Sequence, residues 1–235
     1  KEIVEMKTQI MLSQMQPHFL YNVFTTISSM CEMQNATQAR DVVNKLVKIF
    51  NTKKIGHTGT LDPFATGLLI LLSGKMTKKS GEFLKLDKEY EATICLGKTS
   101  STGDPEGEIL EHEVSHIPSE EEVQKVVQSF SGKIKQRVPN FSAVKINGER
   151  AYKLARKGIE VEMPVREVEI FQIEILDYKW PELKIRCKVS SGTYIRALGE
   201  DIGEKLGVGG YLTELRRTEV GEFRVGEAKK LEEIV

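Results

Sequence analysis

A glycine- and threonine-rich stretch between residues 53 and 67 holds the side chains with the clearest capacity for chemistry. It reads Lys-Lys-Ile-Gly-His-Thr-Gly-Thr-Leu-Asp-Pro-Phe-Ala-Thr-Gly and places one carboxylate, Asp62, near one imidazole, His57. A carboxylate held by a structured loop can act as a nucleophile or as a general base. An Asp before Pro is also typical of a turn or a helix cap, so spacing alone leaves a catalytic and a structural role open.

A second group of polar residues lies at 189–198, where Val-Ser-Ser-Gly-Thr-Tyr-Ile-Arg-Ala-Leu leads from a strand through a turn into a helix. Arg196 falls in the first helical turn, where the helix dipole disfavours a cation unless an anion is nearby. Asp62 and a phosphate group are the two candidates for that anion. The alternative is an exposed surface arginine.

The elements that must position these groups change in character near Phe50. The first 50 residues contain no glycine and a single proline, and their apolar spacing predicts two helices. We then expect strands at 68–72, 89–96, 165–176 and 183–189, and helices at 120–130 and 194–206. The last two strands should turn at Trp180 and Pro181, and the last helix should end at Gly207. Alternation in the last strand places Leu183, Ile185, Cys187 and Val189 on one face. This order of strands and helices predicts an α+β fold in which helices flank a mixed, mostly antiparallel central sheet.

Charge is balanced overall but not locally. The 235 residues include 34 Lys and Arg against 34 Asp and Glu, and no apolar stretch is long enough to cross a membrane. Residues 104–122 hold eight acidic and no Lys or Arg side chains, whereas residues 133–158 hold eight basic and one acidic. The basic run is interleaved with Phe141 and Tyr152, which is typical either of a nucleic-acid contact or of a solvated charged face.

Three further patterns point away from other kinds of site. The three cysteines are far apart and predict neither a disulfide nor a zinc site, which fits a reduced cytoplasmic protein. Residues 92–99 fit a relaxed P-loop pattern, but their alternation favours a strand. His112 and His116 lie four residues apart in an acidic stretch without a further ligand nearby, so we expect a solvated turn and no metal.

A series of motifs gives the sharpest indication. Residues 56–67 resemble the catalytic signature of the TruB family of tRNA pseudouridine-55 synthases, and further matches follow in the family's order. They are Asp-Lys-Glu-Tyr at 87–90, Leu-Gly at 96–97, Thr-Gly-Asp-Pro-Glu-Gly at 102–107, Val-Pro-Asn-Phe-Ser-Ala-Val-Lys at 138–145, Gly-Glu-Arg-Ala-Tyr-Lys-Leu-Ala-Arg-Lys-Gly at 148–158, Ser-Gly-Thr-Tyr-Ile-Arg at 191–196 and Leu-Thr-Glu-Leu-Arg-Arg-Thr at 212–218. The resemblance covers about residues 41–235. It implies an enzyme without cofactor or metal that isomerises uridine 55 in the T loop of tRNA.

The resemblance also implies roles for single residues. Asp62 matches the essential aspartate that acts while the base is detached from C1′ and rejoined through C5. Attack at C1′, attack at C6 and proton abstraction from the sugar all stay open as its route. Tyr90 matches the tyrosine that stacks on the flipped base, Arg196 the arginine that pairs with the catalytic carboxylate, and His57 the histidine that helps to hold the flipped nucleotides. The other matches at substrate- or RNA-binding positions are Asp104, near that arginine, Leu215, in the pocket, and Tyr194 and Lys145.

The chain departs from the family pattern in three places. Asn-Phe stands at 140–141, where Pro-Tyr is usual. The family's first strand, with its Lys-Pro-x-Gly-x-Thr-Ser motif, has no counterpart in residues 1–40. We also expect no C-terminal PUA domain, the RNA-binding domain of many members, and therefore a weaker affinity for tRNA.

Residues 1 to about 44 resemble the phosphoacceptor segment of LytS-type sensor histidine kinases through Gln-Met-Gln-Pro-His-Phe-Leu-Tyr-Asn at 14–22. The resemblance makes His18 the phosphoacceptor, with Asn22 on the same helix face. No ATP-binding domain of that family follows, so we expect no phosphorylation of His18 by this chain alone. The predicted organisation is a fusion of a helical segment, residues 1–40, with a pseudouridine synthase catalytic domain, residues 41–235.

The leading hypothesis is a cytoplasmic tRNA pseudouridine synthase that binds the T stem-loop as a monomer, without a membrane partner. Two alternatives stay open. The first is a signalling module that dimerises through the His18 helices. The second is a folded but inactive RNA-binding protein, since the absent first strand could disturb the sheet behind the Asp62 loop.

Overall fold

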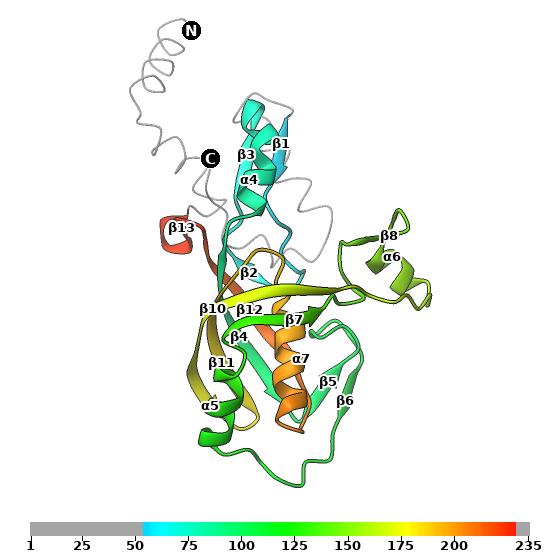
Figure 1. The fold of residues 1–235 in the computed structure, drawn as a ribbon, viewed down its shortest axis with the longest axis vertical. Coiled ribbons are helices and arrows are strands. Elements are labelled where there is room, and N and C mark those ends of the chain that lie inside the picture. Colours follow the sequence, from blue (N-terminus) through cyan, green and yellow to red (C-terminus); the bar gives the residue numbers. More distant parts are fainter. Residues whose placement is uncertain (1–53, 229–235) are drawn as a thin grey trace, which may run out of the picture. The chain divides into compact units, whose positions relative to one another are not determined.

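The computed structural model describes residues 54–228, which are drawn in colour in Figure 1. The helices predicted in the first 50 residues, His18 and the start of the predicted 41–235 domain lie outside the described residues. The chain divides into two compact units. The described part of the first unit is 54–84 together with 218–228, and the second unit runs from Lys85 to Arg217.

The first unit contains a short antiparallel pair of strands. β1 (Ile55–His57) pairs with β3 (Leu71–Ser73), and His57 lies opposite Leu71. The predicted strand over 68–72 is correct in its burial, since Leu68, Ile70 and Leu72 are at most 2% exposed. It is wrong in its continuity, because a separate strand, β2 (Thr66–Gly67), ends at Gly67 with φ +104, and residues 68 and 69 belong to no strand. The unit also contains η2 (Gly74–Lys79), α4 (Ser80–Leu84), β13 (Phe223–Arg224) and η3 (Val225–Glu227).

The second unit is organised on a sheet with the strand order β12-β4-β11-β10-β7. These strands are β4 (Lys88–Leu96), β7 (Gly132–Arg137), β10 (Val165–Lys179), β11 (Glu182–Val189) and β12 (Gly210–Val220), the last of which ends in the first unit. β4 pairs with β11, β11 with β10, and β10 with β7, each antiparallel. The predicted α+β fold with a mostly antiparallel sheet is confirmed.

Side-chain alternation explains why this sheet buries one face. On β11 the side chains of Leu183, Ile185, Cys187 and Val189 are all at most 1% exposed, and the residues between them are more exposed. β10 turns back into β11 at Trp180 and Pro181, as predicted. Because the period of a strand is two, the sequence fixes which face of β11 points to the core.

Two helices cover this face. α5 (Glu120–Gln128) packs against β10, α7 (Ile195–Lys205) packs against β4 and β7, and the two helices contact each other (Figure 1). A capping box at Ser119 and Glu122 begins α5, which buries Val123 and Val127. Gly207, with φ +75, follows the end of α7, as predicted from the sequence.

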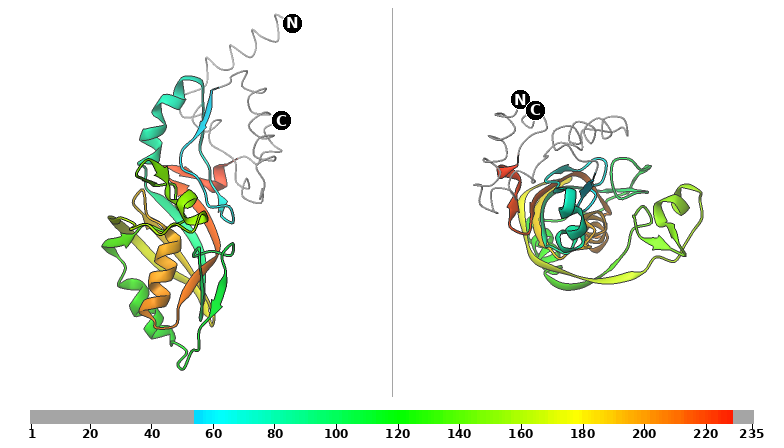
Figure 2. Two further views of the ribbon diagram at one scale, coloured as in Figure 1. Left: turned by 90° about the vertical axis from the view of Figure 1, so that its right-hand side faces the viewer. Right: turned by 90° about the horizontal axis from the view of Figure 1, so that it is seen from above.

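Two small sheets complete the second unit. β5 (Lys98–Ser100) pairs with β6 (Ile109–Glu111), and β8 (Lys145–Ile146) pairs with β9 (Glu149–Arg150), which leads into α6 (Ala151–Arg156). The segment 138–164, here called the basic lobe, contains β8, β9 and α6 and extends away from the sheet of its own unit (Figure 2). Among residues 54–228, no helix is both long and apolar enough to cross a membrane.

Candidate active site

Asp62 lies in the loop between β1 and β2 of the first unit. Its carbonyl oxygen accepts a hydrogen bond from the Ala65 amide at 3.0 Å, which closes a turn, and Ala65 is fully buried. The amide of Thr58 donates to the Ile70 carbonyl at 3.0 Å and fixes the base of the loop. No helix begins at this turn, so the helix-capping alternative for Asp62 is wrong. The turn uses its backbone, and the side chain is half-buried.

Arg196 lies in the first turn of α7, in the second unit, and is only 4% exposed. Its Nη1 donates to the Thr102 carbonyl at 2.7 Å and lies 3.3 Å from Oδ2 of Asp104. Its Nη2 donates to the Phe141 carbonyl at 2.8 Å. An anion does lie beside this cation, but it is Asp104, which the TruB-like motifs had placed near the arginine, and not one of the two candidates drawn from the helix dipole. The alternative of an exposed surface arginine is wrong.

Asp104 is itself fixed by the loop that follows β5. Its Oδ1 accepts hydrogen bonds from the Thr102 hydroxyl and from the Glu106 amide, and its carbonyl accepts one from the Ser100 hydroxyl. Gly103 adopts φ +73, and its carbonyl accepts a hydrogen bond from the amide of Leu212 on β12 at 3.1 Å. The loop therefore holds the Asp104 carboxylate in place before it pairs with Arg196, which lowers the side-chain entropy lost when the ion pair forms.

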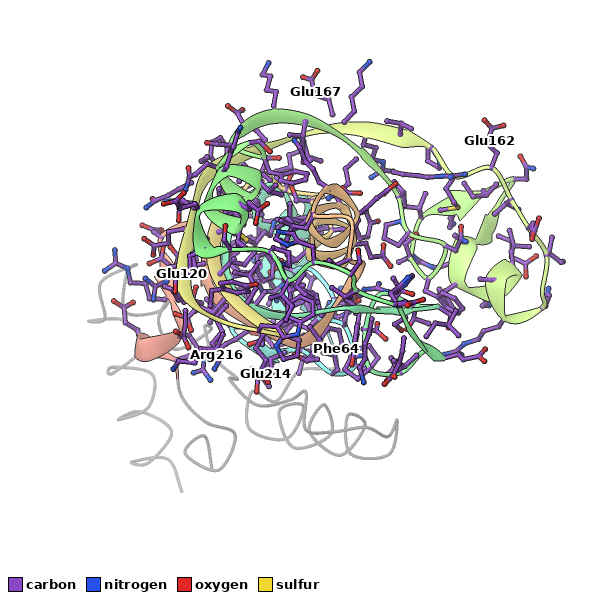
Figure 3. The ribbon with its side chains drawn as sticks, turned by 90° about the horizontal axis from the view of Figure 1, so that it is seen from below. Phe64, Glu120, Glu162, Glu167, Glu214 and Arg216 are labelled. Atoms are coloured by element: carbon purple, nitrogen blue, oxygen red, sulfur yellow. The ribbon has the colours of Figure 1, made fainter. Side chains whose placement is uncertain are left out.

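The other predicted site residues are distributed over both units. His57 is an exposed residue of β1 and belongs to the first unit, as Asp62 does. Tyr90 on β4 and Leu215 on β12 belong to neighbouring strands of the second unit, Tyr90 half-buried and Leu215 only 6% exposed. On β12 the exposed Glu214 and Arg216 flank Leu215 and point away from the interior (Figure 3).

Tyr194 joins the start of α7 to the basic lobe. Its amide donates to Gln136 Oε1 at 2.8 Å, and its carbonyl accepts from Gln136 Nε2 at 3.0 Å. Its side chain packs on the buried cluster of Val138, Ala151 and Met163 at the base of the lobe. These contacts give Tyr194 a structural part in placing Arg196.

The basic lobe carries exposed cations. Lys145, Arg150, Lys153, Arg156 and Lys157 are all exposed. Three of them make local contacts: Arg150 donates to the Ala143 carbonyl, Lys157 pairs with Glu149 at 2.7 Å, and Arg156 lies over the Tyr152 ring. Lys145 belongs to β8, and Figure 3 places the acidic side chain of Glu162 on the same lobe. The lobe offers several cations to a polyanion.

Comparison with known proteins decides the family. The model of the TruB family pseudouridylate synthase N-terminal domain matches residues 47–195, and that of the tRNA pseudouridylate synthase B C-terminal domain matches residues 196–235. The chain belongs to the TruB family. A histidine kinase family model also matches residues 6–61, in keeping with the second resemblance noted in the sequence.

Relatives and solved structures agree with this assignment. The chain is 47% identical over 195 residues to tRNA pseudouridine synthase B of Francisella tularensis subsp. tularensis (strain WY96-3418), covering 82% of this chain and 64% of that protein. It is 46% identical over 201 residues to tRNA pseudouridine synthase B of Clostridium tetani (strain Massachusetts / E88), covering 86% and 69%. The chain thus spans about 64% of the length of the Francisella relatives.

Among solved structures, a Cbf5-Nop10-Gar1 complex matches with a TM-score of 0.61 and 29% identity over 89% of this chain and 52% of the other. An H/ACA RNP bound to a substrate RNA containing 2′-deoxyuridine matches with a TM-score of 0.61 and 27% identity over 92% and 54%.

The patterns that suggested other sites have ordinary structural explanations in this TruB chain. Residues 92–99 lie in β4 and β5, so the strand reading is confirmed and the P-loop pattern is coincidental. His112 Nε2 lies 2.9 Å from the Thr99 hydroxyl, and His116 pairs with Glu122 at 3.1 Å. Within residues 54–228, no group of three or more His, Cys, Asp or Glu side chains is arranged to hold a metal ion.

The sequence reasoning missed one acidic side chain of this site. Glu200 lies one helical turn after Arg196 on α7, and burial raises its pKa to about 7 against the opposing attraction of Arg196. The i to i+4 spacing from Arg196 was a signal that could have identified it, because residues four apart share a helix face. Its neighbour Asp201 has a pKa raised to about 6, again by burial.

Proposed function

We propose that this chain converts uridine to pseudouridine in tRNA, at position 55 of the T loop, with Asp62 as the catalytic carboxylate. The observation that carries the proposal is the buried Arg196, which the Thr102 and Phe141 carbonyls and Asp104 hold inside a motif shared with the TruB family. The TruB relatives bear the name tRNA pseudouridine synthase B, which supports tRNA as the substrate.

The reaction itself sets what the residues must do. The base is detached from C1′ of the ribose and rejoined through C5, and the hydrogen at C5 is lost to solvent as one returns to N1. Atoms and electrons balance within the uridine and water, so no oxidant, reductant or cofactor is needed. Asp62 provides the carboxylate that attacks the nucleoside or removes a sugar proton. The resemblance to the TruB family makes Arg196 the partner of this carboxylate, and a neighbouring cation favours the ionised form of an aspartate.

The uridine must leave the RNA stack to reach these groups. Tyr90 offers an aromatic face for the flipped base, and Leu215 an apolar wall on the neighbouring strand. His57 helps to hold the nucleotides beside the base. The exposed cations of the basic lobe, Lys145 among them, contact the phosphates of the T stem-loop. We propose that one monomer binds one stem-loop.

Release of tritium from a T stem-loop RNA that carries [5-³H]uridine tests this function, because formation of the new bond at C5 displaces that hydrogen. The full chain should release tritium, and Asp62→Asn should reduce the rate at least about 1,000-fold while its affinity for the RNA stays within about threefold. Asp177→Asn, an exposed position on β10, is the matched control and should keep full activity. Turnover by Asp62→Asn within tenfold of the unaltered chain would exclude Asp62 as the catalytic group.

A second function is favoured by one separate observation, the match of a histidine kinase family model to residues 6–61. We propose that the segment around His18 mediates self-association of the chain. Sedimentation velocity of the full chain without RNA should show a dimer that dissociates on dilution, and a monomer at every concentration would refute it.

A further inference from the structure

Glu200 and Arg196 lie on the same face of α7 and enclose the loop at Gly103. A Cβ atom built on Gly103 would lie 2.6 Å from Oε1 and 3.1 Å from Cδ of Glu200, and 3.3 Å from Cβ of Arg196. The Glu200 carboxyl group therefore lies directly against the Gly103 backbone. Because the Gly103 carbonyl also accepts from Leu212 on β12, the loop is held from two sides.

The charges around this carboxyl group compete. Arg196 and Asp201 on α7, and Asp104 from the loop after β5, act electrostatically on Glu200. Arg196 and Asp104 are already an ion pair, with side chains 5% and 4% exposed. An ionised Glu200 would add a further carboxylate beside the Arg196 guanidinium, next to a buried ion pair.

Burial and the two neighbouring carboxylates raise the pKa of Glu200 to about 7, although Arg196 opposes the shift. The group thus changes charge close to neutral pH. In the structure it lies against Gly103, and Arg196 pairs with Asp104. In the ionised form it repels Asp104 and attracts the guanidinium.

We propose that Glu200 is a positioning residue whose protonation state controls how the loop 102–104 holds the Arg196 guanidinium, and thereby sets the pH dependence of catalysis. This inference rests on the proposed function, in which Arg196 pairs with the catalytic carboxylate. The neutral form is the competent one, because it leaves the guanidinium in the position fixed by Thr102, Asp104 and Phe141. Glu200 acts through Arg196 and does not touch the substrate.

The kinetic test compares the full chain with Glu200→Gln, which keeps the shape of the side chain and stays neutral. Initial rates on the T stem-loop RNA are measured from pH 5.5 to 8.5 and separated into kcat and KM. The ratio of kcat for Glu200→Gln to kcat for the unaltered chain should be near one at pH 6 and rise at least threefold by pH 8, with an unchanged KM ratio. Glu204→Gln, an exposed residue one turn further along α7, is the control and should give a flat ratio.

A second measurement does not depend on activity or on the folding of a variant. The ¹⁵Nε resonance of Arg196 in the unaltered chain should move with a single midpoint near pH 7, because the charge beside its guanidinium changes there. A ¹⁵Nε shift that stays constant from pH 5.5 to 8.5, or a flat kcat ratio for a folded Glu200→Gln, overturns the proposal. If the unaltered chain forms no pseudouridine, the proposed function fails. The pH dependence of the Arg196 ¹⁵Nε shift then still decides whether Glu200 acts on this arginine.

Discussion

The guanidinium of Arg196 and the carboxylate of Asp104 form a buried ion pair, 3.3 Å apart, between the first turn of α7 and the loop after β5. The pair matters because both groups have been taken out of water. Removing a single charge from such a pair leaves the other poorly compensated, which costs more than the pair itself contributes.

Asp104→Asn should therefore lower the free energy of unfolding by about 3 kcal/mol. Asparagine retains an Oδ1 acceptor for the Thr102 hydroxyl and the Glu106 amide, so the loss comes from the charge. Urea denaturation followed by circular dichroism measures the effect. Glu167→Gln breaks an exposed pair with Lys133 at 3.6 Å and should change stability by no more than about 0.5 kcal/mol. Equal effects of the two variants would contradict a special role for burial.

The closest approach of α7 to the start of β12 depends on a glycine. A Cβ atom on Gly203 would lie 2.3 Å from the carbonyl carbon of Gly209 and from the amide nitrogen of Gly210. Both contacts are with backbone, which cannot rotate away. Gly203→Ala should destabilise the chain by about 3 kcal/mol or more.

Gly81 in α4 is the matched control, since a Cβ there meets nothing within 4 Å and its φ is not positive. Gly81→Ala should stabilise the chain by about 0.5–1 kcal/mol through its better helix propensity. Thermal melting of both variants should give shifts of opposite sign. A fall in melting temperature for Gly81→Ala, or no fall for Gly203→Ala, would contradict the explanation that backbone contact decides the sign of the effect.

Lys88 at the start of β4 predicts a pH dependence of stability. Burial, with a smaller contribution from Arg217, lowers its pKa to about 8 from an ordinary value of 10.5. Between these two pH values the unfolded chain binds more protons at this position than the folded chain, so the Lys88 contribution to stability rises with pH from about 8 to about 10.5 and is lost as the pH falls through 8.

Lys88→Met should remove that dependence and make the variant more stable than the unaltered chain at pH 7, by about 2 kcal/mol. Denaturant unfolding at a series of pH values gives the free energy of unfolding of both proteins, and the difference between them measures the contribution of Lys88. Lys85→Met, an exposed position three residues earlier, should leave the pH profile unchanged. A parallel pair of profiles for Lys88→Met and the unaltered chain would contradict the burial of this ammonium group.

The basic lobe predicts how RNA binding depends on salt. If Lys145 contacts a phosphate, Lys145→Gln should reduce the slope of log affinity against log salt concentration by about one, and do so equally for any loop sequence. Fluorescence anisotropy with a T stem-loop and with a scrambled loop measures both effects. Lys179, the last residue of β10, has a side chain that is 83% exposed, and Lys179→Gln should leave the slope unchanged. An unchanged slope for Lys145→Gln would remove this lysine from the interface.

The sequence by itself determined the local features of the second unit. Strand alternation placed Leu183, Ile185 and Cys187 on the buried face of β11, and Gly207 marked the end of α7. These features depend on residues a few positions apart, where burial period and backbone geometry are fixed by the chain itself. The motif order likewise determined the TruB family, and with it the expectations for Asp62 and Tyr90.

Only the tertiary structure decided the electrostatics of the candidate site. The local sequence indicated that Arg196 needs an anion, but not that the carbonyls of Thr102 and Phe141 would also accept hydrogen bonds from its guanidinium. It gave no sign that Glu200 titrates near neutral pH. Desolvation and Coulomb interactions depend on how segments distant in the chain are brought together, and one short pattern of residues cannot contain that information.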